Sequence, residues 1–373
     1  MRCCARLVGR VVASLLSVTP VVAGAQQVSR VVLGPASASL AEEFSNLTWV
    51  RELKDGRVVV SDSRDGRVVV ADLRAGTVEQ ISRRGQGPGE YPTARPVWRI
   101  NGDSSVMIDS PRRWLLFDGA RIVATLAPDA PGVATTKGIS RGVDEIGNVY
   151  SSEFLPAGNR PIGDSTALMR VKRSNGHANT ITRLNALVPR RTSSANKDGY
   201  FEFSLPIAAM ADEAVPFADG WIAVVRSEPY RVEWRSVDGK WIRGAPLPFP
   251  VVRMDDREKR AFMARLAAPT GKAPSPPDSI PDWPTTVPAY RSPVALLAAT
   301  DGRLLVPRLA TADNPETRYD IVNRRGTLDA RLVLGANERI VGFGSSSVYV
   351  AVTDDDGIQR LRRHPWPPRA VPR

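Results

Sequence analysis

The stretch Asp55-Gly56-Arg57-Val58-Val59-Val60-Ser61-Asp62 is followed ten residues later by a near copy, Asp65-Gly66-Arg67-Val68-Val69-Val70-Ala71-Asp72. Each copy begins with an Asp-Gly turn and continues into a run of β-branched residues, which is typical of a short strand. The runs are apolar throughout rather than alternating, which indicates strands that are buried on both faces. Because no helical segments separate the copies, radially stacked antiparallel sheets explain this burial better than a parallel sheet covered by helices.

The same unit recurs along the chain as six groups of short predicted strands. Five groups have four strands each and lie within residues 49–83, 96–127, 137–184, 208–249 and 294–334. The sixth group, within 339–365, has three, and we expect Val28–Gly34 to pair as its missing outer strand. Such pairing closes the ring and removes a free edge that would invite aggregation. The sequence therefore predicts an all-β protein, a six-bladed β-propeller over residues 26–373 whose last blade is closed by an N-terminal strand.

Residues 1–25 have the pattern of a cleavable signal peptide. Three arginines precede the mostly apolar run Val11–Val22, and Ala23-Gly24-Ala25 gives the small-x-small pattern of a cleavage site. The apolar run is shorter than the ~20 residues that a transmembrane helix needs. We therefore expect a periplasmic or secreted protein without a transmembrane segment, whose mature chain begins at Gln26.

The composition excludes several kinds of chemistry. Both cysteines, Cys3 and Cys4, lie in the predicted signal peptide, so the mature chain has no disulfide framework, thiolate nucleophile or cysteine-based zinc site. The only histidines are His177 and His364, which disfavours most histidine-dependent catalysis. Calcium requires six to eight oxygen ligands, and the predicted inner strands offer few carboxylates: Glu52, Asp212 and Glu213. We therefore predict no catalytic residues, metal site or cofactor.

The chain is strongly basic. Its formal net charge is +12, and 44 of its 51 basic residues are arginine. These arginines are dispersed, and aromatic residues make up only 6% of the chain, whereas nucleic-acid binders usually gather charge and aromatics in one patch. We therefore expect a solvated basic surface that attracts anionic polymers but no specific nucleic-acid site.

Connection lengths distinguish the two faces of the predicted disc. In an antiparallel blade, the turns between the first and second and between the third and fourth strands share one face. These turns are nearly all short, so we call this the short-turn face. The other connections share the opposite, long-loop face, and they include the stretches 84–95, 155–165 and 185–203. Because binding residues gather in loops on a rigid scaffold, we expect the binding site on the long-loop face; the alternative is that the loops merely vary in length.

The largest insertion, about residues 255–288, lies between the fourth and fifth groups. Asp255 and Glu258 form a capping-box pattern, which predicts a short helix in which Phe262 and Leu266 share a face. Seven prolines follow between Pro269 and Pro288 and predict a stiff irregular arm. We expect this arm to lie across the mouth of the channel; a structural flap that covers apolar surface is the alternative.

A glycine-rich stretch carries a family resemblance. Arg84-Gly85-Gln86-Gly87-Pro88-Gly89-Glu90-Tyr91 resembles the inter-blade signature of NHL-type repeats. It is also similar to a bacterial family of exported six-bladed β-propellers, in which a Gly-Pro-Gly-Glu-aromatic loop follows the first blade. The resemblance spans roughly residues 28–366 and includes three carboxyl-terminal stretches: Asp301–Val306, Tyr319–Val322 and Asp356–Leu361. It implies the fold and export, but no agreed activity.

We interpret the glycine-rich loop as structural. Gly85, Gly87 and Gly89 are expected to include positions with positive φ, which side chains disfavour, and Pro88 belongs to the same structural loop. We expect the carboxylate of Glu90 to accept backbone or arginine hydrogen bonds near the start of the second blade.

The expected binding residues lie around the channel mouth on the long-loop face. Arginine and tryptophan are over-represented in binding hot spots, and the candidates are Arg84, Glu90, Arg112, Arg113 and Trp283. Two functions remain open. The first is a non-enzymatic, monomeric binding or scaffold propeller that recognises an unknown protein, peptide or anionic glycan. The second is a lactonase-like hydrolase or lyase with a divalent metal in the channel, which the scarcity of histidine and axial carboxylates disfavours.

Overall fold

The computed structural model describes residues 28–109, 113–128, 130, 133, 138–152, 164–188, 190–191, 203–204, 206–268 and 272–370. The predicted signal peptide, residues 1–25, and the candidate Arg112 lie outside these residues. No helix in the described ranges is both long and apolar enough to span a bilayer.

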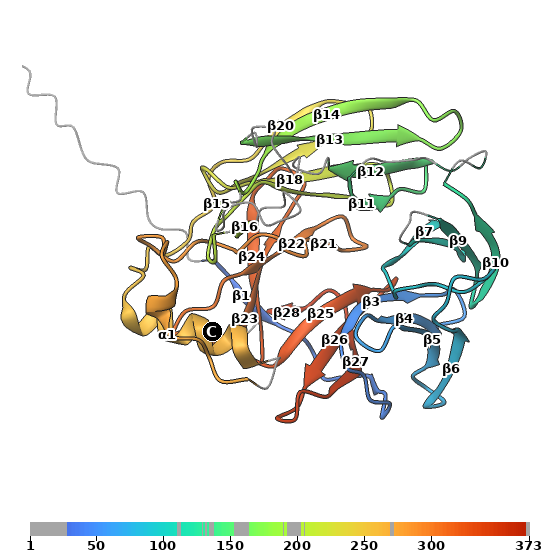
Figure 1. Cartoon of the computed structure of the whole chain (residues 1–373), viewed down its shortest axis with the longest axis horizontal. Helices are drawn as coiled ribbons and strands as arrows, with labels where there is room; N and C mark the ends of the chain where they lie inside the picture. Colours follow the sequence, from blue (N-terminus) through green and yellow to red (C-terminus); the bar gives the residue numbers. More distant parts are fainter. Residues whose placement is uncertain are drawn as a thin grey trace, which may run out of the picture.

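Six blades surround a central axis and follow one another around the ring in chain order (Figure 1), which confirms the predicted six-bladed β-propeller. The strands of each blade are given from the axis outward. Blade 1 contains β3 (Leu47–Glu52), β4 (Val58–Asp62), β5 (Arg67–Asp72) and β6 (Thr77–Ser82), and blade 2 contains β7 (Val97–Asn101), β8 (Ser104–Ile108), β9 (Trp114–Asp118) and β10 (Arg121–Leu126). Blade 3 contains β11 (Ile139–Val143), β12 (Asn148–Ser152), β13 (Ser165–Lys172) and β14 (Ala178–Asn185). A short pair, β15 (Arg190–Arg191) and β16 (Phe203–Ser204), lies in the crossing from blade 3 to blade 4.

Blades 4 to 6 have the same antiparallel order, and two of them gain strands from the chain ends. Blade 4 contains β17 (Glu213–Pro216), β18 (Ile222–Arg226), β19 (Arg231–Arg235) and β20 (Trp241–Arg243). Blade 5 contains β21 (Leu297–Ala298), β22 (Leu304–Arg308), β23 (Thr317–Val322) and β24 (Leu328–Leu334), followed by β1 (Arg30–Val32) and β28 (Arg369–Ala370). Blade 6 contains β25 (Glu338–Phe343), β26 (Ser347–Thr353), β27 (Gln359–Pro365) and β2 (Ala38–Ser39).

The N-terminal segment closes the ring, but not with the residues that we expected. The outer strand of blade 6 is β2, in which Ala38 pairs with Arg363 of β27. The expected run Val28–Gly34 instead contributes β1 to blade 5, where it lies parallel to β24 and antiparallel to β28. The prediction that Val28–Gly34 completes blade 6 is therefore wrong: this more β-prone run extends the neighbouring blade, and the two-residue strand after it completes the ring.

The valine runs fill the spaces between blades. In β4, Val58 and Val60 pack toward blade 6, in a cluster with Tyr349 and Leu361. Val59 lies between them in sequence and packs toward blade 2, in a different cluster. Successive side chains of a strand point to opposite faces, so a strand between two other blades requires apolar residues at every position. Full burial of one such side chain stabilises the fold by roughly 1.5–3 kcal/mol.

The insertion between β20 and β21 contains α1 (Asp256–Ala267) and a short 3-10 helix, η2 (Pro277–Ser279). Asp255 caps α1 by accepting a hydrogen bond from the Glu258 backbone N–H. The Glu258 carboxylate does not complete the capping box but accepts the backbone N–H of Ala312, in the loop between β22 and β23. Phe262 is buried, whereas Leu266, which we expected on the same face, is exposed. In Figure 1, α1 lies at the outer edge of the disc and not across its centre, unlike the expected arm.

Candidate functional site

The glycine-rich loop is a self-contained structural unit. The Glu90 carboxylate accepts hydrogen bonds from the Gly87 backbone N–H at 2.9 Å and from Arg83 Nε at 2.5 Å. These two donors lower the pKa of Glu90 below its ordinary value. Gly89 has the positive φ that we expected, at 75°. At Gly85 the constraint is different, because an added β-carbon would lie 2.0 Å from Glu90 Oε2.

Tyr91 fastens the end of this loop to blade 1. Its ring is fully buried between blades 1 and 2. Its hydroxyl accepts the backbone N–H of Val68 at 2.6 Å and donates to the Ser82 carbonyl at 3.0 Å. The aromatic residue of the motif is therefore an anchor in the core, and it is not available to a ligand.

Arg113, which precedes the third strand of blade 2, binds the same glycine-rich loop. Its guanidinium forms an ion pair with Asp109, at 2.7 Å, and donates to the carbonyls of Gln86 and Glu90. Arg113 and Glu90 thus lie in contact, but the contacts that the guanidinium makes are within the protein. Arg84 is exposed and forms a parallel bridge with Tyr91.

Trp283 lies elsewhere on the ring. It packs against Phe262 of α1, with ring centroids 5.5 Å apart, and its Nε1–H donates to the Pro277 carbonyl. Trp283 belongs to the small core of the insertion between blades 4 and 5, whereas Arg113 and Glu90 lie between blades 1 and 2. Blades follow chain order around the ring, so these two junctions lie on opposite sides of the axis. Among the described residues, the expected binding residues do not gather in one site, because Trp283 lies apart from Arg113 and Glu90.

The carboxylates of the inner region have partners within the protein. Glu52 accepts hydrogen bonds from Ser345 and Tyr349 at the junction of blades 6 and 1. Asp212 forms an ion pair with Arg226 at 2.8 Å, and Glu213 forms one with Arg141 at 2.6 Å. Within the described part of the chain, no three His, Cys, Asp or Glu side chains gather in a group that could hold a metal ion.

Three arginines gather around one buried carboxylate in blade 5. Arg308 ends β22, Arg318 lies near the start of β23, and Arg331 lies in β24. Asp320 is fully buried among them and forms ion pairs with Arg331 at 2.8 Å and Arg308 at 3.3 Å. Arg318 forms no ion pair with Asp320 among the described residues. Within this cluster, three guanidinium groups therefore face a single carboxylate.

Aromatic rings support Arg308 from blade 4. The Arg308 guanidinium lies over the rings of Tyr230 and Phe249, 5.3 and 5.1 Å from their centroids. The Tyr230 hydroxyl donates to Asp320 at 3.0 Å. Burial, together with the charge of Asp320, raises the pKa of Tyr230 well above its ordinary value, so this hydroxyl keeps its proton and remains a donor. Both oxygens of Asp320 accept hydrogen bonds, from Tyr230, Arg308 and Arg331.

Arg318 is the incompletely paired member of the cluster. Its Nη2 donates to the Asn314 carbonyl at 3.4 Å, and its buried Nε has no hydrogen-bond partner among the residues that the structure describes. Burial and the positive charges of Arg308 and Arg331 lower the pKa of Arg318. A positive charge in these surroundings is stabilised by an anion placed within hydrogen-bond distance.

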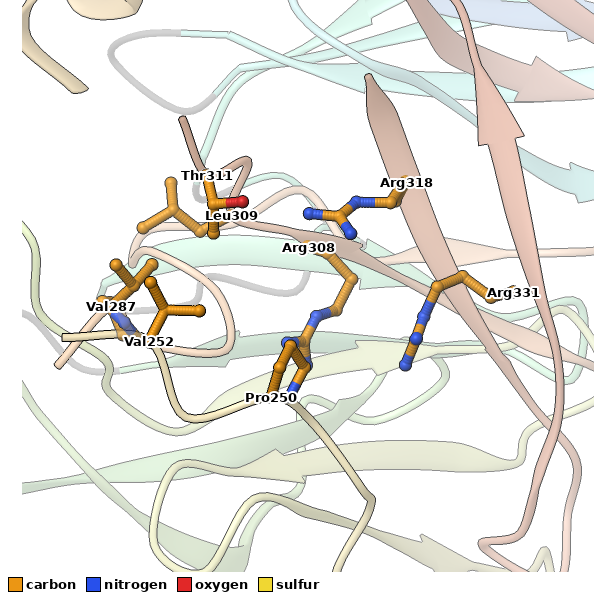
Figure 2. Close-up of a pocket in the computed structure, with 9 residues that line it drawn as sticks. Pro250, Val252, Val287, Arg308, Leu309, Thr311, Arg318 and Arg331 are labelled. Carbon is orange, nitrogen blue, oxygen red and sulfur yellow. The ribbon is translucent and has the colours of Figure 1, made fainter. Parts of the chain in front are cut away.

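A small pocket lies beside Arg318 on the long-loop face (Figure 2). Figure 2 shows Arg308, Arg318 and Arg331 on one side, with Arg318 pointing toward Leu309 and Thr311. Val252 and Val287, from the insertion, form the opposite, apolar side. The free volume is about 10 Å³, close to that needed for one water molecule or one atom of a ligand. We call this space, lined by the three arginines and the insertion, the arginine pocket.

Blade 4 contains a second cluster of the same design. Arg226, Arg231 and Arg243 lie on its second, third and fourth strands, and all three form ion pairs with Glu233 at 2.7–3.0 Å. Arg226 also forms an ion pair with Asp212. Although burial opposes it, hydrogen bonds with Asp212 and Glu233 raise the pKa of Arg226. In blade 4, unlike blade 5, every arginine of the cluster has a carboxylate partner.

Our reasoning from the sequence missed both clusters, although a signal exists. Arg231-Val232-Glu233 and Arg318-Tyr319-Asp320 place an arginine and an acid two residues apart at the start of the third strand of consecutive blades. Residues two apart on a strand share a face. Recognising the pattern requires the blade register, because arginines are frequent throughout this chain.

No family model and no curated protein matches the chain. Solved structures that match include regucalcin, a calcium-binding protein from Agrobacterium tumefaciens, at 11% identity over 92% of this chain and 99% of that chain, with a TM-score of 0.40. A candidate exported protein from Bacteroides fragilis matches at 11% identity over 91% and 94%, with a TM-score of 0.49. An inactive virginiamycin B lyase from Staphylococcus aureus, with quinupristin, matches at 10% identity over 87% and 97%, with a TM-score of 0.40. These similarities concern the fold alone.

Proposed function

We propose that this protein is an exported, non-enzymatic binding propeller that recognises an anionic partner on its long-loop face. The partner is a protein, peptide or glycan, and the propeller acts as a monomer in the periplasm or outside the cell. The signal-peptide pattern of residues 1–25 and the resemblance to a bacterial family of exported propellers support export.

One observation carries the binding proposal: Arg318 borders a pocket on the long-loop face without a carboxylate partner of its own. Glu316 and Asp320 compensate the charge of Arg318 only in part, because its pKa is still lowered, and such a charge favours an anion from outside. The net charge of the chain adds long-range attraction that brings acidic partners to this surface.

The alternative, a hydrolase or lyase with a channel metal, draws on the carboxylates of the inner region. Asp212 and Glu213 would have to exchange their arginine partners for a metal ion. Elemental analysis of protein purified without chelator separates the two functions, because stoichiometric calcium or another divalent ion would favour the enzyme.

The binding proposal is tested with labelled acidic probes at about 0.15 M salt, where long-range surface electrostatics is screened. Fluorescence anisotropy measures the affinity for a hexaglutamate peptide and for an oligogalacturonate. Arg318→Glu reverses a charge at the pocket, and Arg325→Glu makes the same change at an exposed position on the short-turn face of the same blade. We expect only the first substitution to weaken binding, by about tenfold. Equal effects, or no binding of either probe by the wild type, would overturn the proposal.

A further inference from the structure

We infer that the arginine pocket of blade 5 binds the carboxylate group of an aliphatic ligand, such as the acidic side chain of a peptide. This inference rests on the proposed function and names the chemical group that the site selects. Its basis is the comparison of the arginine clusters of blades 4 and 5. In blade 4 every arginine of the cluster has a carboxylate partner, whereas in blade 5 one arginine has none among the described residues.

The two clusters occupy equivalent positions in consecutive blades. In blade 4, Arg226 pairs across the sheet with Arg231, and Glu233 pairs with Arg243. In blade 5, Arg308 pairs with Arg318, and Asp320 pairs with Arg331. In both blades the acid follows the arginine of its own strand by two residues, so the two side chains share a face of the sheet.

The clusters differ by one methylene group in the acid. The longer side chain of Glu233 reaches Arg231, the arginine of its own strand, and accepts from its Nη2 at 2.7 Å. The shorter Asp320 reaches Arg308 and Arg331 but forms no ion pair with Arg318, the counterpart of Arg231. The structure of blade 4 therefore shows which group satisfies an arginine at this position: a carboxylate oxygen in the plane of its guanidinium.

The surroundings of the pocket restrict the ligand further. Its free volume of about 10 Å³ is that of about one water-sized group, so only the tip of a ligand, such as one oxygen of its charged group, enters the closed part of the pocket. Apart from the arginines and Thr311, the lining is apolar, with three aliphatic side chains and two prolines, which suits methylene groups next to a carboxylate. The lining residues provide no aromatic platform, of the kind on which sugar rings usually stack, which favours an acidic side chain over a uronate.

The test measures carboxylate binding directly with small probes. The melting temperature and the calorimetric heat of binding are recorded with formate, acetate and N-acetylglutamate amide. Chloride and sulfate at matched ionic strength are the comparison anions. We expect saturable binding of the three carboxylates and weaker binding of sulfate, with N-acetylglutamate amide binding most tightly because its methylene groups contact the apolar lining.

Two variants place the binding at Arg318. Asp320→Glu lengthens the native carboxylate as in blade 4, so we expect it to occupy the pocket, leave the melting temperature unchanged or higher, and weaken acetate binding by about tenfold or more. Arg318→Gln removes the charge and should weaken binding similarly. The matched control, Arg325→Gln on the short-turn face of blade 5, should bind acetate like the wild type.

The outcomes separate this inference from the proposed function. Acetate binding that is unchanged in both Arg318→Gln and Asp320→Glu would overturn the inference. Chloride binding as tight as acetate binding would also overturn it, because the site would then accept any small anion. Capture of hexaglutamate without dependence on Arg318 would leave the proposed function standing and the inference refuted. Acetate binding at Arg318 without capture of any acidic polymer would support the inference and refute the proposed function.

Discussion

Gly85 lies against the carboxylate of Glu90 so closely that a β-carbon at position 85 would stand 2.0 Å from Oε2. The glycine is required by this contact and not by its φ, since Gly89 is the residue of the loop with positive φ. The Glu90 carboxylate in turn holds the Gly87 backbone N–H and Arg83. A side chain at Gly85 therefore displaces the group that organises the loop.

We expect Gly85→Ala to lower the melting temperature by a few degrees, because it expels the Glu90 carboxylate from its hydrogen bonds. In a Glu90→Ala background the same substitution should cost little, since the carboxylate is already absent. A double-mutant cycle of thermal unfolding measures this coupling. Additive effects of the two substitutions would show that Gly85 is required for another reason.

Ring closure depends on β2 and the residues after it more than on β1. Deletion of residues 28–33 removes β1 from between β24 and β28, so we expect a lower melting temperature and some association through the exposed edge of β24. Leu40→Ala should destabilise the protein by about 2–5 kcal/mol, because Leu40 is 1% exposed in the core between blades 6 and 1. Thermal unfolding and size-exclusion chromatography distinguish these effects. If the 28–33 deletion variant were unfolded at room temperature, β1 would be as important for ring closure as β2, and the prediction would be wrong.

The attachment of α1 to blade 5 depends on Glu258. Both oxygens of its buried carboxylate accept the backbone N–H of Ala312, at 3.0 and 2.9 Å. We expect Glu258→Ala to make the insertion more sensitive to limited proteolysis while the propeller strands remain protected. Arg257→Ala is the control, because its exposed ion pair with Asp313 contributes little to stability. Cleavage rates that are equal in the two variants would show that Glu258 does not hold the helix in place.

The blade 4 cluster predicts a pH-dependent contribution to stability. Burial opposes ionisation of Glu233, but Arg226 and Arg231 outweigh it and lower its pKa below the ordinary value of 4.5. A carboxyl whose folded pKa is depressed contributes stability above its unfolded pKa and loses that contribution as the pH falls through the folded value.

Glu233→Gln should therefore reduce the free energy of unfolding by roughly 1.5–3 kcal/mol at neutral pH. The difference from the wild type should shrink as the pH falls below 4.5, the ordinary value. Denaturant unfolding from pH 7 to pH 3 measures it, with the exposed Glu79→Gln of β6 as the control. A deficit that stays constant over this range would rule out the charge of Glu233 as its source.

The fold was predictable because repeated turns and double-sided burial leave a periodic trace in the sequence. The Asp-Gly turns before β4 and β5 mark strands that two neighbouring blades enclose. The closing strand was assigned wrongly, since Val28–Gly34 has the stronger β-propensity, whereas β2 is only Ala38–Ser39 and is held by its pairing with β27. Tertiary pairing, which propensity does not describe, decided between these two adjacent segments.

The candidate site was less predictable, because its chemistry depends on cross-strand neighbours. Counting strands places Arg113 near Glu90, but it does not reveal that Asp109 and two carbonyl groups occupy the guanidinium of Arg113. The distinction between Arg318 and Arg231 depends on whether the nearby acid has one methylene group or two. Such a difference becomes informative only after the sheet register is known.

The seam of the ring joins the two ends of the polypeptide. The backbone N–H of Ser37 donates to the carbonyl of Arg363, 326 residues away, and β1 lies in the blade before the one that β2 completes. The residues of β1 and β2 therefore find their partners only after the last blade has been made. Before these residues pair, the chain is an open arc without a circular path of contacts, and pairing at the seam converts it into a closed ring. Because contacts between distant residues form slowly, we expect pairing at this seam to be a late and slow step of folding.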